Sequence, residues 1–477
     1  MAKVGVWNTP SDRILPGVYS RFLKVASSYG EGLVGTIGIP VRSNWGPVGE
    51  VVTVKNSILD LKEKFGDDEA SKFTAYRLGK LLVNTNLKYI KMYRVADSSA
   101  AKSSINLKNT NGAATDIIKL TSKYPTSKDL NVTVKKSVAP EKTVEMYIYE
   151  GTKLLCRIYG IKGTVDEMVK VINTTYDNKY IVAEKLAEST DILAEVSNKK
   201  LAGGNDGCLG ITNKEYIASL KAFERERIDG FVLDAREDES LDVTVFEWIK
   251  ENYSNGRTIM YFSGARTGED IYATCDRAKK VNNKLYSITA SSGVIDNVKY
   301  TPLETAVYLC GLEISNKLKE SSCNRVTIFN SVGTMFTNAE LEEAHKSGVI
   351  TLDIDGDDVV IVDDVNTYKI YEDDNENETV YGFNRTIRTV SAINDMLVTS
   401  GKPLIGKVNS DEIGYDIIIT AFKKGFEYLI ASGALKEFSI AIDQERQEKA
   451  KSDEFFFVWD AIRLDKVKRM YGTGTLR

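Results

Sequence analysis

Between residues 210 and 349, short apolar runs alternate with longer segments of helical periodicity. The runs are rich in β-branched and aromatic residues, and most are followed by apolar residues at helical spacing. Repeated strand–helix units of this kind form a parallel sheet that helices cover on both faces. We therefore expect an α/β core with strands over residues 230–235, 258–263, 284–289 and 325–330, and helices over residues 242–253, 268–281, 302–318 and 338–346.

Residues 97–200 have a different pattern, in which strands dominate. A single helix is expected after Thr164, which is followed three residues later by Glu167 and so forms a capping box. Short strands joined by polar turns are typical of a small sandwich or barrel. We expect a β-sandwich inserted in the α/β core, with strands over residues 116–121, 130–138, 144–150, 153–158 and 180–184.

The rest of the chain completes this organisation. Residues 349–367 predict an antiparallel hairpin that turns at Asp355-Gly356-Asp357, and residues 414–433 predict a long helix. The expected domains are an N-terminal extended arm (1–25), a first part of the core (26–96), the β-sandwich (97–200), the α/β core (201–367), a C-terminal α+β domain (368–469) and a C-terminal arm (470–477).

Both ends of the chain are strand-like but have no strand close by in the sequence. Residues 9–22 contain prolines, which cannot continue a central ladder, and residues 454–463 are apolar on both faces. An open sheet edge invites another chain, and an added strand supplies main-chain hydrogen bonds. We predict strand exchange between subunits through Pro16, Gly17, Val18, Tyr19, Arg21 and Phe22 in the N-terminal arm, and through Phe456, Val458, Asp460, Ile462, Tyr471, Thr473 and Leu476 at the C-terminal end.

The catalytic signals are weak. The single histidine, His345, excludes a His-Glu-x-x-His zinc site and a paired-histidine mechanism. It lies in the last turn of a predicted helix, where an imidazole satisfies free carbonyls, and no Gly-x-Ser-x-Gly elbow accompanies it. The glycine pattern from Gly30 to Gly35 continues as a strand, whereas a dinucleotide site needs a helix there. We expect no enzymatic activity and no cofactor.

Acidic side chains are clustered near the end of the core, and a basic cluster lies near the end of the chain. The first acidic cluster consists of Asp353, Asp355, Asp357 and Asp358. It lacks the glycine and the glutamate that a calcium-binding loop needs at fixed positions, so we expect a solvated hairpin tip and no metal site there. The same exposure is expected for Asp363 and Asp364. A short basic group suits an acidic protein partner and is too small for nucleic acid: Lys466, Lys468 and Arg469.

Whole-chain properties limit the compartment and the partners. The formal net charge of −4 lacks the basic excess of a nucleic-acid-binding protein. The five cysteines are far apart and form no Cys-x-x-Cys pair, as expected for reduced thiols in a cytoplasm. No apolar run approaches the roughly 18 residues of a membrane span, and the N-terminus has no secretory h-region. We expect a soluble protein without direct membrane insertion.

Several motifs along the chain occur in an order that is typical of one protein family. Pro16-Gly17-Val18-Tyr19 resembles that family's Pro-Gly-Val-Tyr start, and residues 35–47 resemble its glycine-containing strand and Gly-Pro turn. Residues 123–134 resemble its Lys-Tyr-Pro-Gly stretch, without the glycine after Pro125 and with a shifted asparagine. Residues 201–207 resemble its Leu-x-Gly-Gly-x-Asp-Gly junction. The chain thus resembles the sheath proteins of contractile-tailed phages, R-type bacteriocins and other contractile injection systems.

The resemblance implies an α/β core with a subtilisin-like arrangement but no catalytic triad, an outward-facing β-sandwich and a C-terminal domain close to the tail tube. It implies hexameric rings of this protein stacked helically around a tail tube protein, together with baseplate and tail-terminator proteins. The expected location is a virion or phage-tail-like particle assembled in the cytoplasm of the bacterial host. Contraction of the sheath would drive the tube through a target cell envelope without ATP.

The resemblance also directs attention to the helix predicted over residues 414–433. It carries Lys423 and Lys424 beside an apolar stripe of Ile417, Ile418, Phe422 and Phe426. The stripe must be buried, which leaves both lysines available to an acidic tube. Two alternatives remain open: another self-assembling shell protein, such as a capsid or surface-layer protein, and a hydrolase or NTPase on the α/β core.

Overall fold

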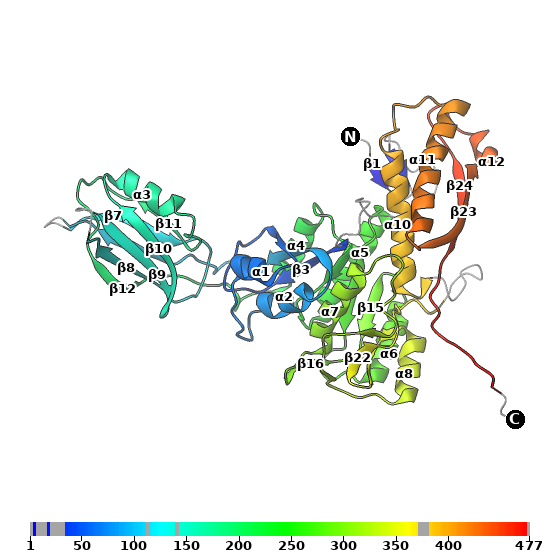
Figure 1. The fold of residues 1–477 in the computed structure, drawn as a ribbon, viewed down its shortest axis with the longest axis horizontal. Helices are drawn as coiled ribbons and strands as arrows, with labels where there is room; N and C mark the ends of the chain where they lie inside the picture. The colour runs from blue at the N-terminus through cyan, green and yellow to red at the C-terminus, as the bar shows by residue number, and fades with distance from the viewer. Residues whose placement is uncertain are drawn as a thin grey trace. The chain divides into compact units, whose positions relative to one another are not determined.

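A computed structural model describes residues 3–5, 17–19, 34–110, 114–138, 143–370 and 381–474 (Figure 1). The chain divides into two compact units. Met1–Ile39, Lys80–Lys91 and Phe223–Arg477 form the first unit, and Pro40–Gly79 and Met92–Ala222 form the second.

A largely parallel sheet, most of it in the first unit, confirms the expected α/β core. Its strands follow the order β20-β15-β14-β13-β3-β5-β4, which ends at β4 (Val51–Lys55), and the pairs from β20 to β3 are parallel. The strands are β3 (Val34–Val41), β5 (Leu87–Arg94), β13 (Gly230–Val232), β14 (Met260–Gly264), β15 (Tyr286–Thr289) and β20 (Val349–Ile350). The helices between them are α5 (Glu239–Ser254), α6 (Ile271–Val281), α7 (Pro302–Ser315) and α8 (Asn338–Ser347).

Helices cover both faces of this sheet, as the contacts of strand β14 show. Tyr261 points toward α5, where its hydroxyl bonds Asp242. Gly264 faces α7, and a Cβ at this position would lie 2.3 Å from the backbone of Pro302. Because successive side chains of a strand point to opposite faces, α5 and α7 lie on opposite sides of the sheet.

One expected strand of the core is wrong. Residues 325–330 do not join the parallel sheet; only β18 (Arg325–Val326) is a strand, and it pairs antiparallel with β22 (Asp358–Ile361). β22 also pairs with β21 (Leu352–Asp355) in the hairpin predicted around Gly356. Phe329, which contributes to the apolar pattern, is instead buried against Tyr300 and Tyr308. A further small sheet contains β16 (Gly293–Ile295), β17 (Val298–Lys299) and β19 (Ser331–Val332).

The second unit contains the β-sandwich. One sheet has the order β10-β9-β8-β12 and the other β11-β7-β6, around a shared apolar core. The strands are β6 (Ser104–Lys108), β7 (Asp116–Ser122), β8 (Leu130–Lys136), β9 (Val144–Glu150), β10 (Lys153–Ile161), β11 (Ile181–Lys185) and β12 (Val196–Lys200), with helix α3 (Val165–Thr174). The expected capping box is present at Thr164, as are those at Thr301 and Thr337 in the first unit.

The two ends of the sandwich lie side by side. The Asp97 amide donates to the Gly207 carbonyl at 2.8 Å, and Ala101 and Asn205 exchange two backbone hydrogen bonds of 2.9 Å. Arg94 is fully buried just before this point and donates to the Asp206 carbonyl at 3.0 Å. The rest of this unit includes β4 (Val51–Lys55), α1 (Ile58–Phe65) and most of α4 (Asn213–Phe223). The residues of α2 (Ala75–Val83) are divided between the two units.

Two helices and a hairpin form the last part of the first unit. Helix α10 (Asn384–Gly401) lies beside α11 (Glu412–Ala431), and α11 covers the antiparallel pair β23 (Leu435–Ile442) and β24 (Phe457–Arg463) (Figure 1). The short helix α12 (Gln444–Gln447) lies between these two strands in the sequence. Among the residues described, no helix is long and apolar enough to cross a membrane.

Candidate functional site

The β23–β24 hairpin has a buried face and an exposed face. On β24, Phe457, Trp459 and Ala461 pack against the core that α11 supplies, whereas Val458 and Ile462 are 53% and 43% exposed. In the single chain, therefore, one face of this strand is covered and the other is not. Within the described ranges β24 pairs with β23 alone, so its outer edge is an open edge of the kind that accepts another strand.

The predicted exchange residues have different surroundings. Gly17, Val18 and Tyr19 form β2 (Gly17–Tyr19), which pairs in parallel with β1 (Lys3–Gly5) of the same chain, whereas no partner strand was expected nearby. Tyr471 and Thr473 follow the hairpin, outside any strand, and Tyr471 is 91% exposed. Phe456 and Asp460 belong to the hairpin region. The predicted residues that lie outside the described ranges are Pro16, Arg21, Phe22 and Leu476.

Helix α11 presents both predicted lysines on its exposed side. Lys423 and Lys424 are exposed, and Phe422 and Phe426 are buried against the hairpin. The predicted apolar stripe is wrong at one position, because Ile417 is 46% exposed and Ile419 is buried in its place. In a helix of 3.6 residues per turn, position 419 lies on the same face as Phe422 and Phe426, whereas position 417 does not.

The carboxyl ends of the parallel strands are the usual ligand-binding edge of an α/β sheet. Here a buried carboxylate fills it: Asp242 accepts hydrogen bonds from the hydroxyls of Tyr261, at 2.6 Å, and Tyr286, at 2.7 Å. Burial, together with the charge of Asp242, raises the pKa of both tyrosines. The remaining pocket, bordered also by Arg236 and Arg266, has a volume of about 10 Å³, the space of a single water.

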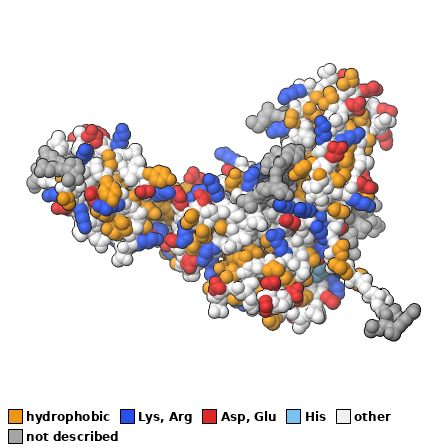
Figure 2. Space-filling view, viewed as in Figure 1, with side chains coloured by type: hydrophobic (Ala, Val, Ile, Leu, Met, Phe, Trp, Pro, Cys, Tyr) orange, Lys and Arg blue, Asp and Glu red, His pale blue; other side chains and the backbone are white. Residues whose placement is uncertain are grey.

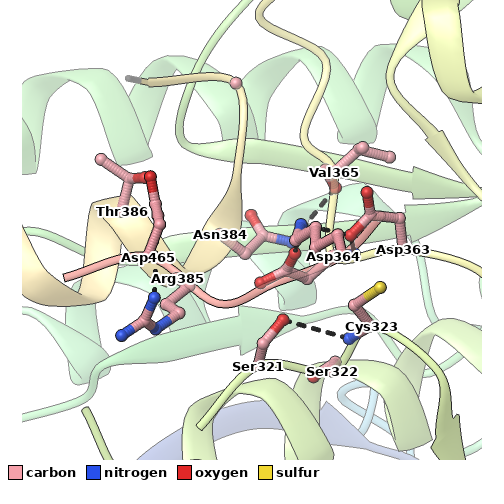
Figure 3. Close-up of polar contacts among 12 residues, drawn as sticks. Ser321, Ser322, Cys323, Asp363, Asp364, Val365, Asn384, Arg385, Thr386 and Asp465 are labelled. Carbon is pink, nitrogen blue, oxygen red and sulfur yellow. Dashed lines mark hydrogen bonds and ion pairs between the residues drawn. The ribbon is translucent and has the colours of Figure 1, made fainter. Parts of the chain in front are cut away.

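Two aspartates after β22 form an unexpected buried site. Asp363 and Asp364 were interpreted as exposed, but their side chains are only 10% and 0% exposed. Figure 3 shows them beside Cys323 and the start of α10. Asp363 lies 2.9 Å from His345 Nε2, so the histidine at the end of α8 contacts a carboxylate, rather than the carbonyls predicted. Glycine Gly348 caps that helix end itself.

The C-terminal segment supplies the cation of this site. Lys468 Nζ forms ion pairs with Asp363 and, at 2.7 Å, with Asp364, and lies 3.9 Å from the centre of the Phe383 ring. The basic group of residues 466–469 thus finds an acidic partner within its own chain. Three residues upstream, Asp465 pairs with Arg385 (Figure 3) and Arg463.

Opposite forces act on the two carboxyl groups. Burial raises the pKa of Asp364 to about 6, and the charge of nearby Glu313 adds to this effect. Burial acts in the same direction on Asp363, but the hydrogen bond with His345 and the charge of Lys468 outweigh it and lower the pKa of Asp363 below its ordinary value. Asp363 is therefore ionised over a wider pH range than Asp364.

A second buried ion pair joins α10 to α7. Arg388 Nε donates to Glu313 at 2.7 Å, and both side chains are less than a tenth exposed. The same guanidinium donates to the carbonyls of Asn316, Lys317 and Glu320. One arginine thereby satisfies the backbone acceptors at the C-terminal end of α7.

The remaining predictions on surface and chemistry concern charge and thiols. All five cysteines are free. In the part of the chain that the structure describes, no group of three His, Cys, Asp or Glu side chains is arranged to hold a metal ion. Figure 2 shows acidic and basic side chains interspersed on the visible face.

Comparisons with known proteins agree with this domain arrangement. Residues 96–206 match the phage tail sheath protein beta-sandwich domain, residues 210–367 the central domain and residues 376–477 the C-terminal domain. The uncharacterized protein YqbK of Bacillus subtilis is 22% identical over 419 residues, which are 84% of this chain and 82% of that protein.

Solved structures share the fold. A sheath tail protein of Desulfitobacterium hafniense has a TM-score of 0.69 at 17% identity, over 93% of this chain and 100% of that chain. The sheath complex of an extracellular contractile injection system, PVC, in its contracted state has a TM-score of 0.52 at 8% identity, over 98% of each chain. With its β-sandwich, central and C-terminal domains all matched, the chain belongs to the phage tail sheath protein family.

Proposed function

We propose that this protein is the structural subunit of a contractile sheath, which polymerises around a tail tube and contracts to drive the tube through a target envelope. The observation that carries the proposal is the open edge of β24 beside an exposed C-terminal segment, in a chain with sheath domains throughout. A strand from a neighbouring subunit would complete this sheet by main-chain hydrogen bonds. The role is structural rather than catalytic, and the subtilisin-like arrangement of the core belongs to the same proposal.

Negative-stain microscopy of the purified protein tests this function. We expect tubes with an axial lumen, built from stacked six-membered rings. Closed shells or flat lattices would favour the alternative of another self-assembling shell protein. Hydrolysis of ATP or esters that disappears with His345→Ala would favour an enzyme on the α/β core.

We expect the β-sandwich to be dispensable for polymerisation, because its ends meet at the Asp97–Gly207 hydrogen bond. Replacing residues 99–204 by a short Gly/Ser linker should leave a core that still forms tubes. Since Trp45 packs against Tyr124 and Tyr180 of the sandwich, the deletion should also carry Trp45→Ser, and the full chain with Trp45→Ser is the control. A deletion variant that folds but does not polymerise would place the sandwich in the sheath wall.

Charge reversal on α11 tests the proposed contact with the tube. Lys423→Glu combined with Lys424→Glu should weaken co-sedimentation with tubes by about 5- to 30-fold, equivalent to about 1–2 kcal/mol, and more strongly at low salt. Lys402→Glu with Lys407→Glu is the matched control, because these lysines are also exposed and the change in net charge is equal. Equal effects of the two pairs would remove the assignment.

A further inference from the structure

The segment after β24 is held at three points. The Leu464 amide donates to the Ala434 carbonyl at 3.0 Å, Asp465 pairs with Arg385 of α10 at 3.7 Å, and Lys468 reaches Asp363 and Asp364. Other side chains of this segment are exposed: Val467 is 75% exposed and Met470 is 88% exposed. The contacts with the core therefore end at Lys468, and the described side chains that follow it face solvent.

The Asp363–Asp364 pocket has the composition of a cation receptor. Both carboxyl groups are buried, and Asp364 Oδ2 has no hydrogen-bond partner among the described residues. The other charged groups around it are His345, Glu313 and Arg385. Arg388 is already paired with Glu313, and Arg385 is paired with Asp465. A buried carboxylate pair without a cation is strongly unfavourable, so the pocket requires the ammonium that it receives.

The ring of Phe383 adds to the fit. An ammonium over an aromatic face is stabilised by the ring quadrupole, and Lys468 Nζ lies 3.9 Å from the ring centre. Although burial lowers it, the charges of Asp364 and Asp363 raise the pKa of Lys468. The ammonium form of Lys468 is thus favoured inside the pocket. The Lys468 side chain is only 26% exposed.

We propose that the Asp363–Asp364 pocket is a binding site for the ammonium of Lys468, which fixes the base of the C-terminal arm on the core of its own subunit. The proposal rests on the sheath function, because it limits the C-terminal strand that this subunit can donate to residues after Lys468. The pocket therefore sets the point from which the arm can extend toward a neighbouring subunit.

Lysine reactivity in the full-length monomer tests the docking without any polymer. Acylation requires an accessible neutral amine, so an N-hydroxysuccinimide ester should modify Lys468 at least about tenfold more slowly than exposed Lys466. In Asp363→Asn with Asp364→Asn, the two rates should converge. Equal rates in the unaltered chain would overturn the docking, whether or not the double variant folds. Protection that increases with protein concentration would mean that a neighbour's lysine occupies the pocket, and would overturn the assignment to its own subunit.

Tube formation tests the consequence for the arm. Lys468→Met keeps most of the side chain but removes the charge, and it should give shorter or irregular tubes, whereas Lys466→Met should give normal ones. Normal tubes from Lys468→Met would overturn the limit on the arm. If the unaltered chain formed no tubes while Lys468 stayed protected, the sheath function would fail and the docking would stand.

Discussion

Removal of Met1–Phe22 or of Met470–Arg477 leaves a folded, soluble subunit that no longer forms long tubes. Met470 and Tyr471 are 88% and 91% exposed, so loss of the C-terminal segment should cost little stability, and we expect the same of the N-terminal arm. Each strand-exchange contact would use a few main-chain hydrogen bonds worth about 0.5–1.5 kcal/mol each. Circular dichroism would check the folding of each truncation, and electron microscopy its assembly.

A single substitution separates main-chain pairing from side-chain contacts. Thr473→Pro removes one backbone donor and cannot continue a ladder, so it should shorten the tubes nearly as much as the truncation. Thr473→Ser keeps the donor and serves as the matched control. A truncation that still polymerised to normal length would show that its segment does not link subunits.

Arg388→Met destabilises the first unit by about 3–5 kcal/mol, the cost of leaving a buried carboxylate without its partner. The substitution leaves Glu313 unpaired and frees the carbonyls of Asn316, Lys317 and Glu320. Denaturant unfolding would measure the loss, and hydrogen exchange would locate it at the end of α7 and in α10.

Two further variants identify the cause. Arg446→Met removes a mostly exposed arginine paired with Asp443, and should change the free energy of unfolding by less than about 1 kcal/mol. Glu313→Met combined with Arg388→Met removes both charges, and should recover part of the loss. A double variant less stable than Arg388→Met alone would contradict the ion-pair explanation, because it would mean that packing alone carries the effect.

The alternating core and the capping boxes could be predicted because their signals are local. Thr301 and Glu304 are three residues apart, and the structure forms both bonds of the box between them. β12 could not be predicted for a physical reason: only one of its residues is even partly buried, so the sequence shows no apolar alternation there. The strand expected over residues 325–330 is longer than β18, in which only Arg325 and Val326 pair.

The carboxylate pocket could not be predicted, because its partners are far apart in the chain. Asp364 and Lys468 are separated by 104 positions, and neither has an unusual sequence neighbourhood. Asp363 and Asp364 follow an apolar strand, which is equally compatible with an exposed turn. Their burial depends on how α8, α10 and the C-terminal segment converge, which no spacing rule describes.

The place where the C-terminal segment is fastened has a mechanical consequence. Leu435 and Arg463 form the pair at the open end of the β23–β24 hairpin, and tension on the arm acts at that end. An antiparallel pair loaded in this way peels apart one rung at a time rather than resisting with all its rungs at once. The bonds of Leu464 with Ala434, of Asp465 with Arg385 and of Lys468 with Asp364 lie between the arm and this first rung. In the proposed sheath they would transmit a pull from a neighbouring subunit to the body of the domain, and the hairpin would not unzip.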